Sequence, residues 1–351
     1  MNSSLIKTEL TKLPRPVRVK PIFAPRIMHF GPGAFFRSFV ASLIDEVNEK
    51  SVEKWGIIAV SLNSESTFDK LAPQEFVFNS LAMSSLAKEV QKISSISDFL
   101  VAHKDGQVVL DALSDEKIEI VSLTITEKGY CYNSAKRTLD FNNQKIVEDL
   151  NDIKNPKTAV GFIVAGLRER YLNRKSPFTV LSCDNLPNNG AIVKKIVLDF
   201  AQKIDPAFAN WVSKQNCFPS TMVDRITPET KEKDIIGFAT EYGIYDPALV
   251  VHEEFFQWVI EDKFFSVRPS FELAGIQMVN NVELHEKMKL RCLNGTHSAL
   301  AYLGYLAGFN TIAECASDKI MVQYIQYLWA KEIIQTLETP EGENLNGYCQ
   351  Q

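Results

Sequence analysis

The chain has 351 residues, of which 45% are hydrophobic and 23% are charged, and its net charge is -5. These values describe an ordinary soluble globular protein long enough for two domains, and they exclude a strongly basic nucleic-acid-binding surface. No stretch reaches the length of a membrane span, and the proline-broken N-terminal segment lacks the apolar core of a signal peptide. We therefore expect a cytoplasmic protein without nucleic-acid or membrane partners, as a monomer or small homo-oligomer.

The first predicted elements form a βαβ unit. The segment "RIMHFG" predicts a strand, "GPGAFFRSF" a turn that leads into an amphipathic helix to about residue 50, and "WGIIAVSL" a second strand. Gly31 and Gly33 supply two of the three glycines of a dinucleotide fingerprint, with Phe36 where the last small residue is expected. An ordinary glycine turn accounts for this motif equally well when it is taken alone. The βαβ pattern is what favours nucleotide binding.

The second strand is followed by "LNSES", in which Glu65 is the only local carboxylate for the ribose hydroxyls of a dinucleotide. No arginine follows there to bind a 2′-phosphate. The segment therefore favours NAD over NADP, although Glu65 is equally compatible with a solvated loop position.

Further along the chain, strands continue to alternate with helices. The alternating segments "EFVFNSL" and "KEVQKISSI" predict an inserted antiparallel hairpin, and "IEIVSLTIT" predicts a buried strand ending at Glu127. Helical stretches around residues 157–172 precede the strand "FTVLSC", which ends in the loop "DNLPNNG" before another helix. This order predicts an α/β fold with a Rossmann-like, doubly wound, mostly parallel sheet.

From about residue 281 the sequence becomes helical throughout. We divide the chain into a dinucleotide-binding domain with the inserted hairpin, residues 1–280, and a mostly α-helical substrate and catalytic domain, residues 281–351. The last segment, "TPEGENLNGYCQQ", reads as a polar turn before a helix that does not follow. We therefore expect the helical domain to be incomplete.

Polar residues interrupt the apolar helix predicted for residues 287–303. At about 100° per residue, with Lys289 at zero, His297 falls near 80° and Asn294 near 140°. The same sector holds leucines, whereas a separate sector at about 160° to 200° is the one expected to face solvent. The leucines are Leu290, Leu293 and Leu300, and the solvent-facing residues are Lys287, Arg291 and Ser298.

Taken singly, Lys289 fits a snorkelling side chain and His297 a hydrogen-bonded core histidine. Together with Asn294, and with Glu286 in the same sector at about 60°, they place four polar groups on one helix face. Desolvation lowers the pKa of a lysine, which makes it a general base near neutral pH. An amide and an imidazole nearby can hold an alcohol oxygen as it becomes a carbonyl.

Other motifs have structural explanations of equal or greater weight. Asp184 and Asn185 follow a predicted central strand, at the edge where α/β sheets bind ligands, but Asx residues also form turns. Asp224 and Arg225 fit a structural ion-pair network as well as a site. The pattern "YNSAK" at residues 132–136 matches the YxxxK pair of short-chain dehydrogenases, yet it lacks a helical stripe, and we interpret it as a chance match. The six cysteines and five histidines form no CxxC or HExxH pair, so no metal site is expected.

Six segments, in this order, resemble the mannitol dehydrogenase family of polyol-specific long-chain dehydrogenases and reductases. They are "HFGPGAFFRSF", "VSLTITEKGY", "LSCDNLPNNG", "FPSTMVDRITP", "FQWVIEDKF" and "MKLRCLNGTHSALAYLGYLAG". The KxxxxNxxH spacing of Lys289, Asn294 and His297 is similar to the catalytic signature of that family. One departure is Phe36, which stands where many relatives have a histidine and is expected to alter the nicotinamide side of the pocket.

The resemblance implies a metal-independent hydride transfer with NAD, and less readily NADP, as cofactor. It implies these catalytic roles: Lys289 as general base, Asn185 and Asn294 as oxyanion hole, His297 as the substrate-orienting residue, Asp224 as an acid and Glu286 on the proton path. The cofactor contacts that we predict are Gly31, Gly33, Ala34, Phe35 and Arg37 in the phosphate turn, together with Glu65 and Glu127.

The implied reaction interconverts a secondary alcohol of a sugar alcohol or aldonate with the keto sugar. Mannitol with fructose and mannonate with fructuronate both remain open, and "YDPALVVHEEFFQWVIEDKF" favours mannonate by overall similarity. We expect the catalytic helix at the domain junction, facing Asn185 across a cleft. The alternative is a non-catalytic nucleotide-binding protein or an inactive fragment.

Overall fold

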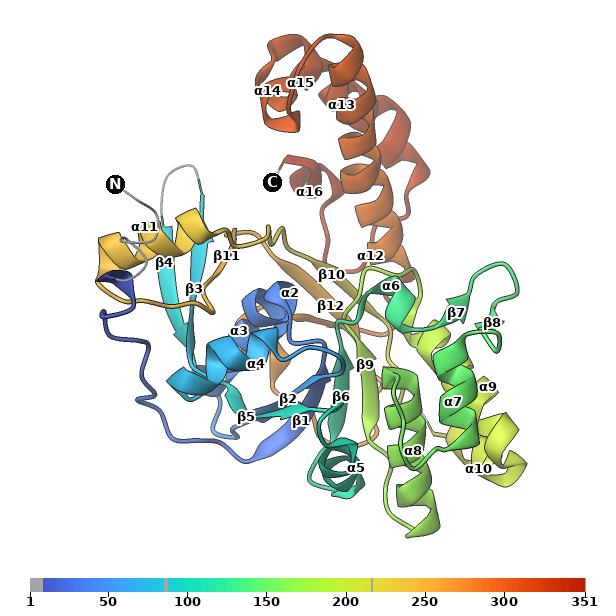
Figure 1. Ribbon diagram of the computed structural model, residues 1–351. Coiled ribbons are helices and arrows are strands. Elements are labelled where there is room, and N and C mark those ends of the chain that lie inside the picture. The colour runs from blue at the N-terminus through green and yellow to red at the C-terminus, as the bar shows by residue number, and fades with distance from the viewer. Residues whose placement is uncertain (1–8, 85–87, 216, 351) are drawn as a thin grey trace. The chain divides into compact units, whose positions relative to one another are not determined.

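The computed structural model describes residues 9–84, 88–215 and 217–350. The chain divides into two compact units, Met1–Asn280 and Asn281–Gln351, and the elements of each are labelled in Figure 1. Among the described residues, no helix combines the length and the apolar character needed to cross a membrane.

The first unit is built on a parallel five-stranded sheet with the order β5-β2-β1-β6-β9. The strand order reverses between β1 and β6, and ligands of such sheets bind outside the carboxyl ends of the two strands at this switch point. The predicted Rossmann-like sheet is therefore confirmed. Its strands are β1 (Pro25–Phe30), β2 (Gly56–Ser61), β5 (Ile96–Val101), β6 (Ile120–Leu123) and β9 (Thr179–Ser182).

Both faces of this sheet are buried, which explains why its strands are continuous apolar runs in the sequence. Met28 and Phe30 of β1 belong to a core shared with the helices α5 (Gly106–Ser114), α8 (Ala159–Leu172) and α9 (Asn189–Ile204). Ile27 points to the opposite face, into a second core with α3 (Ser42–Lys50). Figure 1 shows helices on both sides of the sheet.

Two three-stranded sheets also belong to the first unit. The predicted hairpin is confirmed as β3 (Phe78–Met83) and β4 (Lys88–Ile93), which pair antiparallel. A third strand, β11 (Val250–Glu253), adds parallel to β3, a pairing that the sequence did not reveal. The other sheet has the order β10-β12-β13, with bounds Thr221–Asp224, Gln257–Glu261 and Gln277–Val279.

Short elements connect these layers. Residues 132–136 lie on a two-stranded ribbon of β7 (Tyr132–Asn133) and β8 (Thr138–Leu139) and the turn between them, so they do not form the helix that a YxxxK pair requires. The remaining α-helices described in this unit are α2 (Ala34–Phe36), α4 (Ser66–Leu71), α6 (Thr126–Gly129), α7 (Gln144–Asn151), α10 (Pro206–Ser213) and α11 (Glu232–Tyr242).

The second unit is helical, as predicted. In its last segment the expectation that no helix follows the polar turn is wrong, because α16 forms there and Asn344 Oδ1 accepts a hydrogen bond of 3.1 Å from Gly347 N. The α-helices are α12 (Glu283–Met288), α13 (Gly295–Leu306), α14 (Ile312–Ser317), α15 (Lys319–Leu328) and α16 (Leu345–Gln350), and the π-helical segments are η4 (Lys289–Asn294) and η5 (Trp329–Ile333).

Candidate active site

The glycine turn lies at the carboxyl end of β1, at the switch point of the sheet. Gly31 has a φ of +93°, and a Cβ atom built on it would lie 2.1 Å from the carbonyl oxygen of Thr124. Gly33 is exposed, and a Cβ there would meet only the Gly31 oxygen, at 4.0 Å. Gly31 is thus required by the fold, whereas the open space at Gly33 fits the close approach of a pyrophosphate.

The residues after this turn are mostly buried. Arg37 donates from Nη1 to the carbonyl of Pro32 at 3.0 Å, and burial lowers its pKa to about 10. Phe36 is fully buried and stacks on His29 with ring centroids 3.8 Å apart. Arg37 therefore supports the turn from inside the protein, and Phe36 packs behind the turn against His29. Ala34 and Phe35 are partly exposed.

The strand β6 ends at Leu123, four residues before the predicted end at Glu127. Three residues after the end of the strand, Thr126 adopts a φ of +62°, a left-handed conformation that is unfavourable for a β-branched residue. Its backbone N–H donates to Asp184 Oδ1 at 3.1 Å. Glu127 is therefore an exposed residue of the short helix α6 at the same edge of the sheet.

Asp184 and Asn185 follow β9, the neighbour of β6. Asp184 is half-buried and binds the turn after β6, while Asn185 is exposed. Burial raises the pKa of the Asp184 carboxyl, and hydrogen bonds from Tyr130 and from two backbone N–H groups oppose this shift. The sequence did not single out Tyr130, because nothing in its local pattern links it to the following strand.

Glu65 is the N-cap residue of α4, in the loop that follows β2. It forms an ion pair with Lys104 and lies 3.3 Å from His103 Nε2, and the hydrogen bond from Lys104 lowers the pKa of the carboxyl. Its side chain is one-third exposed. The ionised carboxylate therefore stands at the loop where a ribose acceptor is expected, already in contact with two side chains.

Asp224 and Arg225 at the end of β10 have different surroundings. Asp224 is buried and pairs in register with Gln257 on β12. Arg225 donates to the carbonyl of Ser38, and its guanidinium lies 5.0 Å from the ring centre of Phe256. Burial lowers the pKa of Arg225 to about 10. Arg225 thus ties the helix after the glycine turn to the neighbouring sheet.

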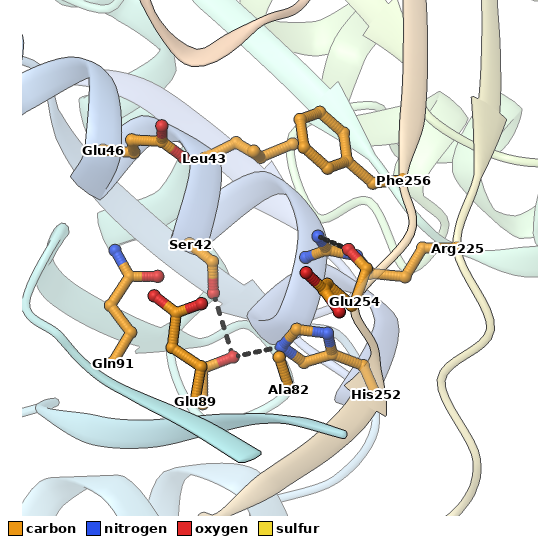
Figure 2. Close-up of a pocket in the computed structure, with 11 residues that line it drawn as sticks. Ser42, Leu43, Glu46, Ala82, Glu89, Gln91, Arg225, His252, Glu254 and Phe256 are labelled. Atoms are coloured by element: carbon orange, nitrogen blue, oxygen red, sulfur yellow. Dashed lines mark hydrogen bonds between the residues drawn. The ribbon is translucent and has the colours of Figure 1, made fainter. Parts of the chain in front are cut away.

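Arg225 also lines a pocket of about 280 Å³ within the first unit, shown in Figure 2, which the sequence did not predict. In this pocket Ser80 Oγ lies 2.8 Å from His252 Nε2, and His252 Nδ1 lies 2.7 Å from the carbonyl oxygen of Glu253. Because the carbonyl requires a donor, Nδ1 carries the proton and the Ser80 hydroxyl donates to Nε2. The pocket lining also includes three acidic side chains, those of Glu46, Glu89 and Glu254.

In the second unit, Lys289 and Asn294 are the first and last residues of the π-helical segment η4, between α12 and α13. In a π-helix the hydrogen bonds run between residues five apart, so residue i+5 stands over residue i as residue i+4 does in an α-helix. The bond from Gly295 N to Leu290 O has this spacing. Lys289 and Asn294 therefore share a face more closely than α-helical geometry allows.

The π-helical turn corrects our description of this helix. Leu290 and Leu293 are 58% and 41% exposed, whereas Lys289 is only 7% exposed, so Lys289 does not point where these two leucines point. Asn294 is half-buried and His297 is exposed. The solvated sector is confirmed, since its three residues Lys287, Arg291 and Ser298 are all exposed.

Side chains from the same unit hold the turn. The Thr296 hydroxyl donates to the carbonyl of Cys292 at 2.6 Å, and the Trp329 indole N–H donates to Thr296 Oγ1 at 2.6 Å. These bonds stabilise a backbone carbonyl in the segment where the α-helical hydrogen-bond pattern is interrupted. No spacing in the sequence could have indicated Trp329, which is 33 residues from Thr296.

Within the described ranges, no group of three or more histidine, cysteine or carboxylate side chains is arranged to hold a metal ion. All six cysteines are free thiols, and five of them are buried.

Two family models match the chain: the mannitol dehydrogenase Rossmann domain over residues 25–273 and the mannitol dehydrogenase C-terminal domain over residues 281–351. The chain belongs to the mannitol dehydrogenase family. This confirms the resemblance that the six sequence segments indicated.

Within the mannitol dehydrogenase family, relatives from bacteria match nearly the whole chain. An uncharacterized oxidoreductase, YeiQ, and D-mannonate oxidoreductase, both of Escherichia coli, are 41% and 40% identical over 89% and 92% of the chain. The chain spans 64% and 68% of their lengths. The structure of Pseudomonas fluorescens mannitol 2-dehydrogenase with NAD and D-mannitol matches with 37% identity and a TM-score of 0.86, over 98% of this chain and 72% of that one.

Proposed function

We propose that this protein is an oxidoreductase that interconverts a secondary alcohol of a sugar alcohol or aldonate with the corresponding keto sugar, with NAD as cofactor. The observation that carries the proposal is the match over 98% of this chain to an enzyme solved with NAD and D-mannitol. Mannitol and mannonate are the two substrate candidates, since relatives named for each are about equally similar to this chain.

The carboxyl edge of the central sheet supports the cofactor assignment. Gly33 is exposed and has free space where a Cβ would stand, and it precedes a helix, as a pyrophosphate site requires. The turn from Gly31 to Phe35 would hold the phosphates, with Arg37 supporting it from inside, and Glu65 and Glu127 would contact the rest of the dinucleotide. NAD, when bound, supplies the hydride acceptor.

The chain's own residues would manage the proton and the charge on oxygen. A secondary alcohol gives up hydride only as its hydroxyl proton leaves, so a base and oxyanion donors must act on the same oxygen. We assign the base to Lys289 and the oxyanion donors to Asn185 and Asn294. We further assign substrate orientation to His297, an acid role to Asp224 and the proton path to Glu286.

The test follows NADH absorbance with mannitol, arabinitol, mannonate and their keto partners as substrates. We expect turnover of at least one pair, with NAD preferred to NADP, and unchanged activity in a metal chelator. Lys289→Ala should lower kcat by a factor of about 10² to 10⁴, the usual range for loss of a general base. Lys287→Ala is the matched control, because Lys287 lies two residues away but is exposed and paired with Glu283 at 2.6 Å.

NADH binding by the folded protein without turnover of any substrate would favour the non-catalytic alternative. Full activity of Lys289→Ala would overturn the lysine mechanism but not the family's reaction. Activity lost in the chelator and restored by zinc would overturn metal independence.

A further inference from the structure

The turn after β6 is fixed by a carboxylate from the loop that follows the neighbouring strand β9. Asp184 Oδ2 accepts a hydrogen bond from Ile125 N at 2.9 Å, and Oδ1 accepts one from Thr126 N at 3.1 Å. The Tyr130 hydroxyl also donates to Oδ2, at 2.6 Å, and stands 2.6 Å from Ser182 Oγ. One side chain thus satisfies two consecutive backbone donors and a buried phenol.

The segment that Asp184 holds is strained. Thr126 has a φ of +62°, and a β-branched residue in this region costs about 1–2 kcal/mol or more. Such a conformation persists only where surrounding groups determine it. The bidentate contact from Asp184 is a charge-assisted interaction of the kind that can offset this cost.

The same segment contacts the glycine turn. Thr124 Oγ1 donates to the carbonyl of Gly31 at 2.7 Å, and the Thr124 carbonyl occupies the space that a Cβ on Gly31 would need. The turn from Ile125 to Glu127 therefore stands beside the glycine turn at the switch point. A displacement of a few tenths of an ångström in this turn would alter the crevice in which the cofactor is proposed to lie.

Because its bonds order this crevice, we propose that Asp184 is a positioning residue for the cofactor. Its carboxylate fixes the Ile125–Glu127 turn and keeps the backbone N–H groups of Ile125 and Thr126 occupied. This inference rests on the proposed function, since it concerns the same dinucleotide site.

The chain contains a matched control. Asp149 accepts hydrogen bonds from Lys157 N at 2.7 Å, Thr158 N at 3.0 Å and Thr158 Oγ1 at 2.6 Å. It thus has the same two consecutive amides and one hydroxyl as Asp184, but it holds the turn before α8. Burial raises the pKa of both carboxyls. The two aspartates differ in position: the turn held by Asp184 lies beside the glycine turn, whereas the turn held by Asp149 precedes α8.

The experiment compares Asp184→Asn with Asp149→Asn in the full chain. Either amide can accept at only one of the two positions that the carboxylate served, so both variants should lose thermal stability. We expect the Kd for NADH, measured by quenching of tryptophan fluorescence, to rise about tenfold in Asp184→Asn and less than twofold in Asp149→Asn, as a lost charge-assisted hydrogen bond implies. In turnover, the KM for NADH should rise more than kcat falls.

Tyr130→Phe keeps the carboxylate and removes one donor, so it should fold and raise the Kd for NADH by a smaller factor. It serves as the deciding variant if Asp184→Asn does not fold, and wild-type affinity in Tyr130→Phe would then overturn the inference. Wild-type affinity in Asp184→Asn, or an equal loss in Asp149→Asn, would also overturn it. Failure of the wild-type protein to bind NADH would instead overturn the proposed function.

Discussion

The indole Nε1 of Trp329 donates a hydrogen bond of 2.6 Å to Thr296 Oγ1, and the Thr296 hydroxyl donates in turn to the carbonyl of Cys292. Cys292 lies inside the π-helical segment whose first and last residues are Lys289 and Asn294. Two polar side chains outside this segment therefore stabilise the backbone irregularity that aligns two proposed catalytic residues.

Replacing Thr296 by Val keeps the shape of the side chain but removes the hydroxyl that accepts from the indole and donates to the carbonyl; the indole keeps only its longer direct bond of 3.3 Å to that carbonyl. Because both partners lose a hydrogen bond, we expect the free energy of unfolding to fall by about 1–3 kcal/mol. Trp329→Phe should have a smaller effect in the Thr296→Val background than in the wild type, since the two residues share one bond. We also expect kcat to fall as the π-helical turn relaxes.

Urea unfolding and NADH-linked turnover of the two single variants and the double variant measure these effects. Ser298→Ala is the control, because it removes a similar bond to the carbonyl of Asn294, of 3.0 Å, at an exposed position. Additive unfolding free energies, or an unchanged kcat in Thr296→Val, would show that this bond does not maintain the turn.

This region also shows where prediction from sequence ends. Residue spacing indicated that Lys289, Asn294 and His297 act together, but the angles assumed a uniform α-helix. The π-helical turn changes these angles, and the indole of Trp329, which bonds to Thr296 beside it, comes near only through tertiary packing. Local periodicity contains no information on such a bond.

A second prediction separates the two glycines of the turn. Gly31→Ala should destabilise the protein by about 3 kcal/mol, since the position has a positive φ and a Cβ would collide with the Thr124 carbonyl. Gly33→Ala should leave stability within about 0.5 kcal/mol, because its Cβ would meet open space. That same Cβ should raise the Kd for NADH about tenfold by obstructing the pyrophosphate.

Thermal unfolding and a fluorescence titration with NADH distinguish the two effects. If Gly33→Ala bound NADH like the wild type, the turn would not be the phosphate site, whatever the stability of Gly31→Ala.

The sequence predicted those parts of the fold whose burial leaves a local apolar pattern. It did not predict contacts between segments that are far apart in the chain. Strands buried on both faces are continuous apolar runs, which is why the parallel sheet could be predicted from the sequence. The pairing of β11 with β3 joins Val250 to Ser80, and no local pattern specifies a partner so far away. Likewise, the left-handed turn after β6 is bonded by Asp184, which lies far along the chain in the loop after β9.

The third prediction concerns Glu65. If its carboxylate accepts from the ribose hydroxyls, it also repels a 2′-phosphate, so Glu65→Ala should reduce the preference for NAD over NADP by about tenfold. The midpoint of unfolding should not change, because the ion pair with Lys104 is partly exposed.

The ratio of kcat/KM for the two cofactors measures this preference, with Asp69→Ala as an exposed control on the same helix. An unchanged ratio would mean that Glu65 serves only its contacts with Lys104 and His103.

The fourth prediction is an acid-sensitive stability that originates at His29. Its two ring nitrogens each lie 2.8 Å from a hydroxyl, of Ser122 and of Thr124, and burial lowers its pKa to about 3. Above the unfolded-state value of 6.5, histidine is neutral in both states and its contribution does not depend on pH. Below 6.5 the unfolded chain takes up the proton first, so stability falls by about 1.4 kcal/mol per pH unit.

Urea unfolding between pH 7 and pH 5 should therefore show a shallower loss of stability in His29→Gln, whose amide can still bond to a hydroxyl, than in the wild type. His103→Gln is the control, because His103 is exposed. His252 is also buried, and burial lowers its pKa to about 4, so part of the pH dependence of stability should remain in both variants. An identical slope in His29→Gln and the wild type would show that His29 protonates equally readily in the folded and unfolded states.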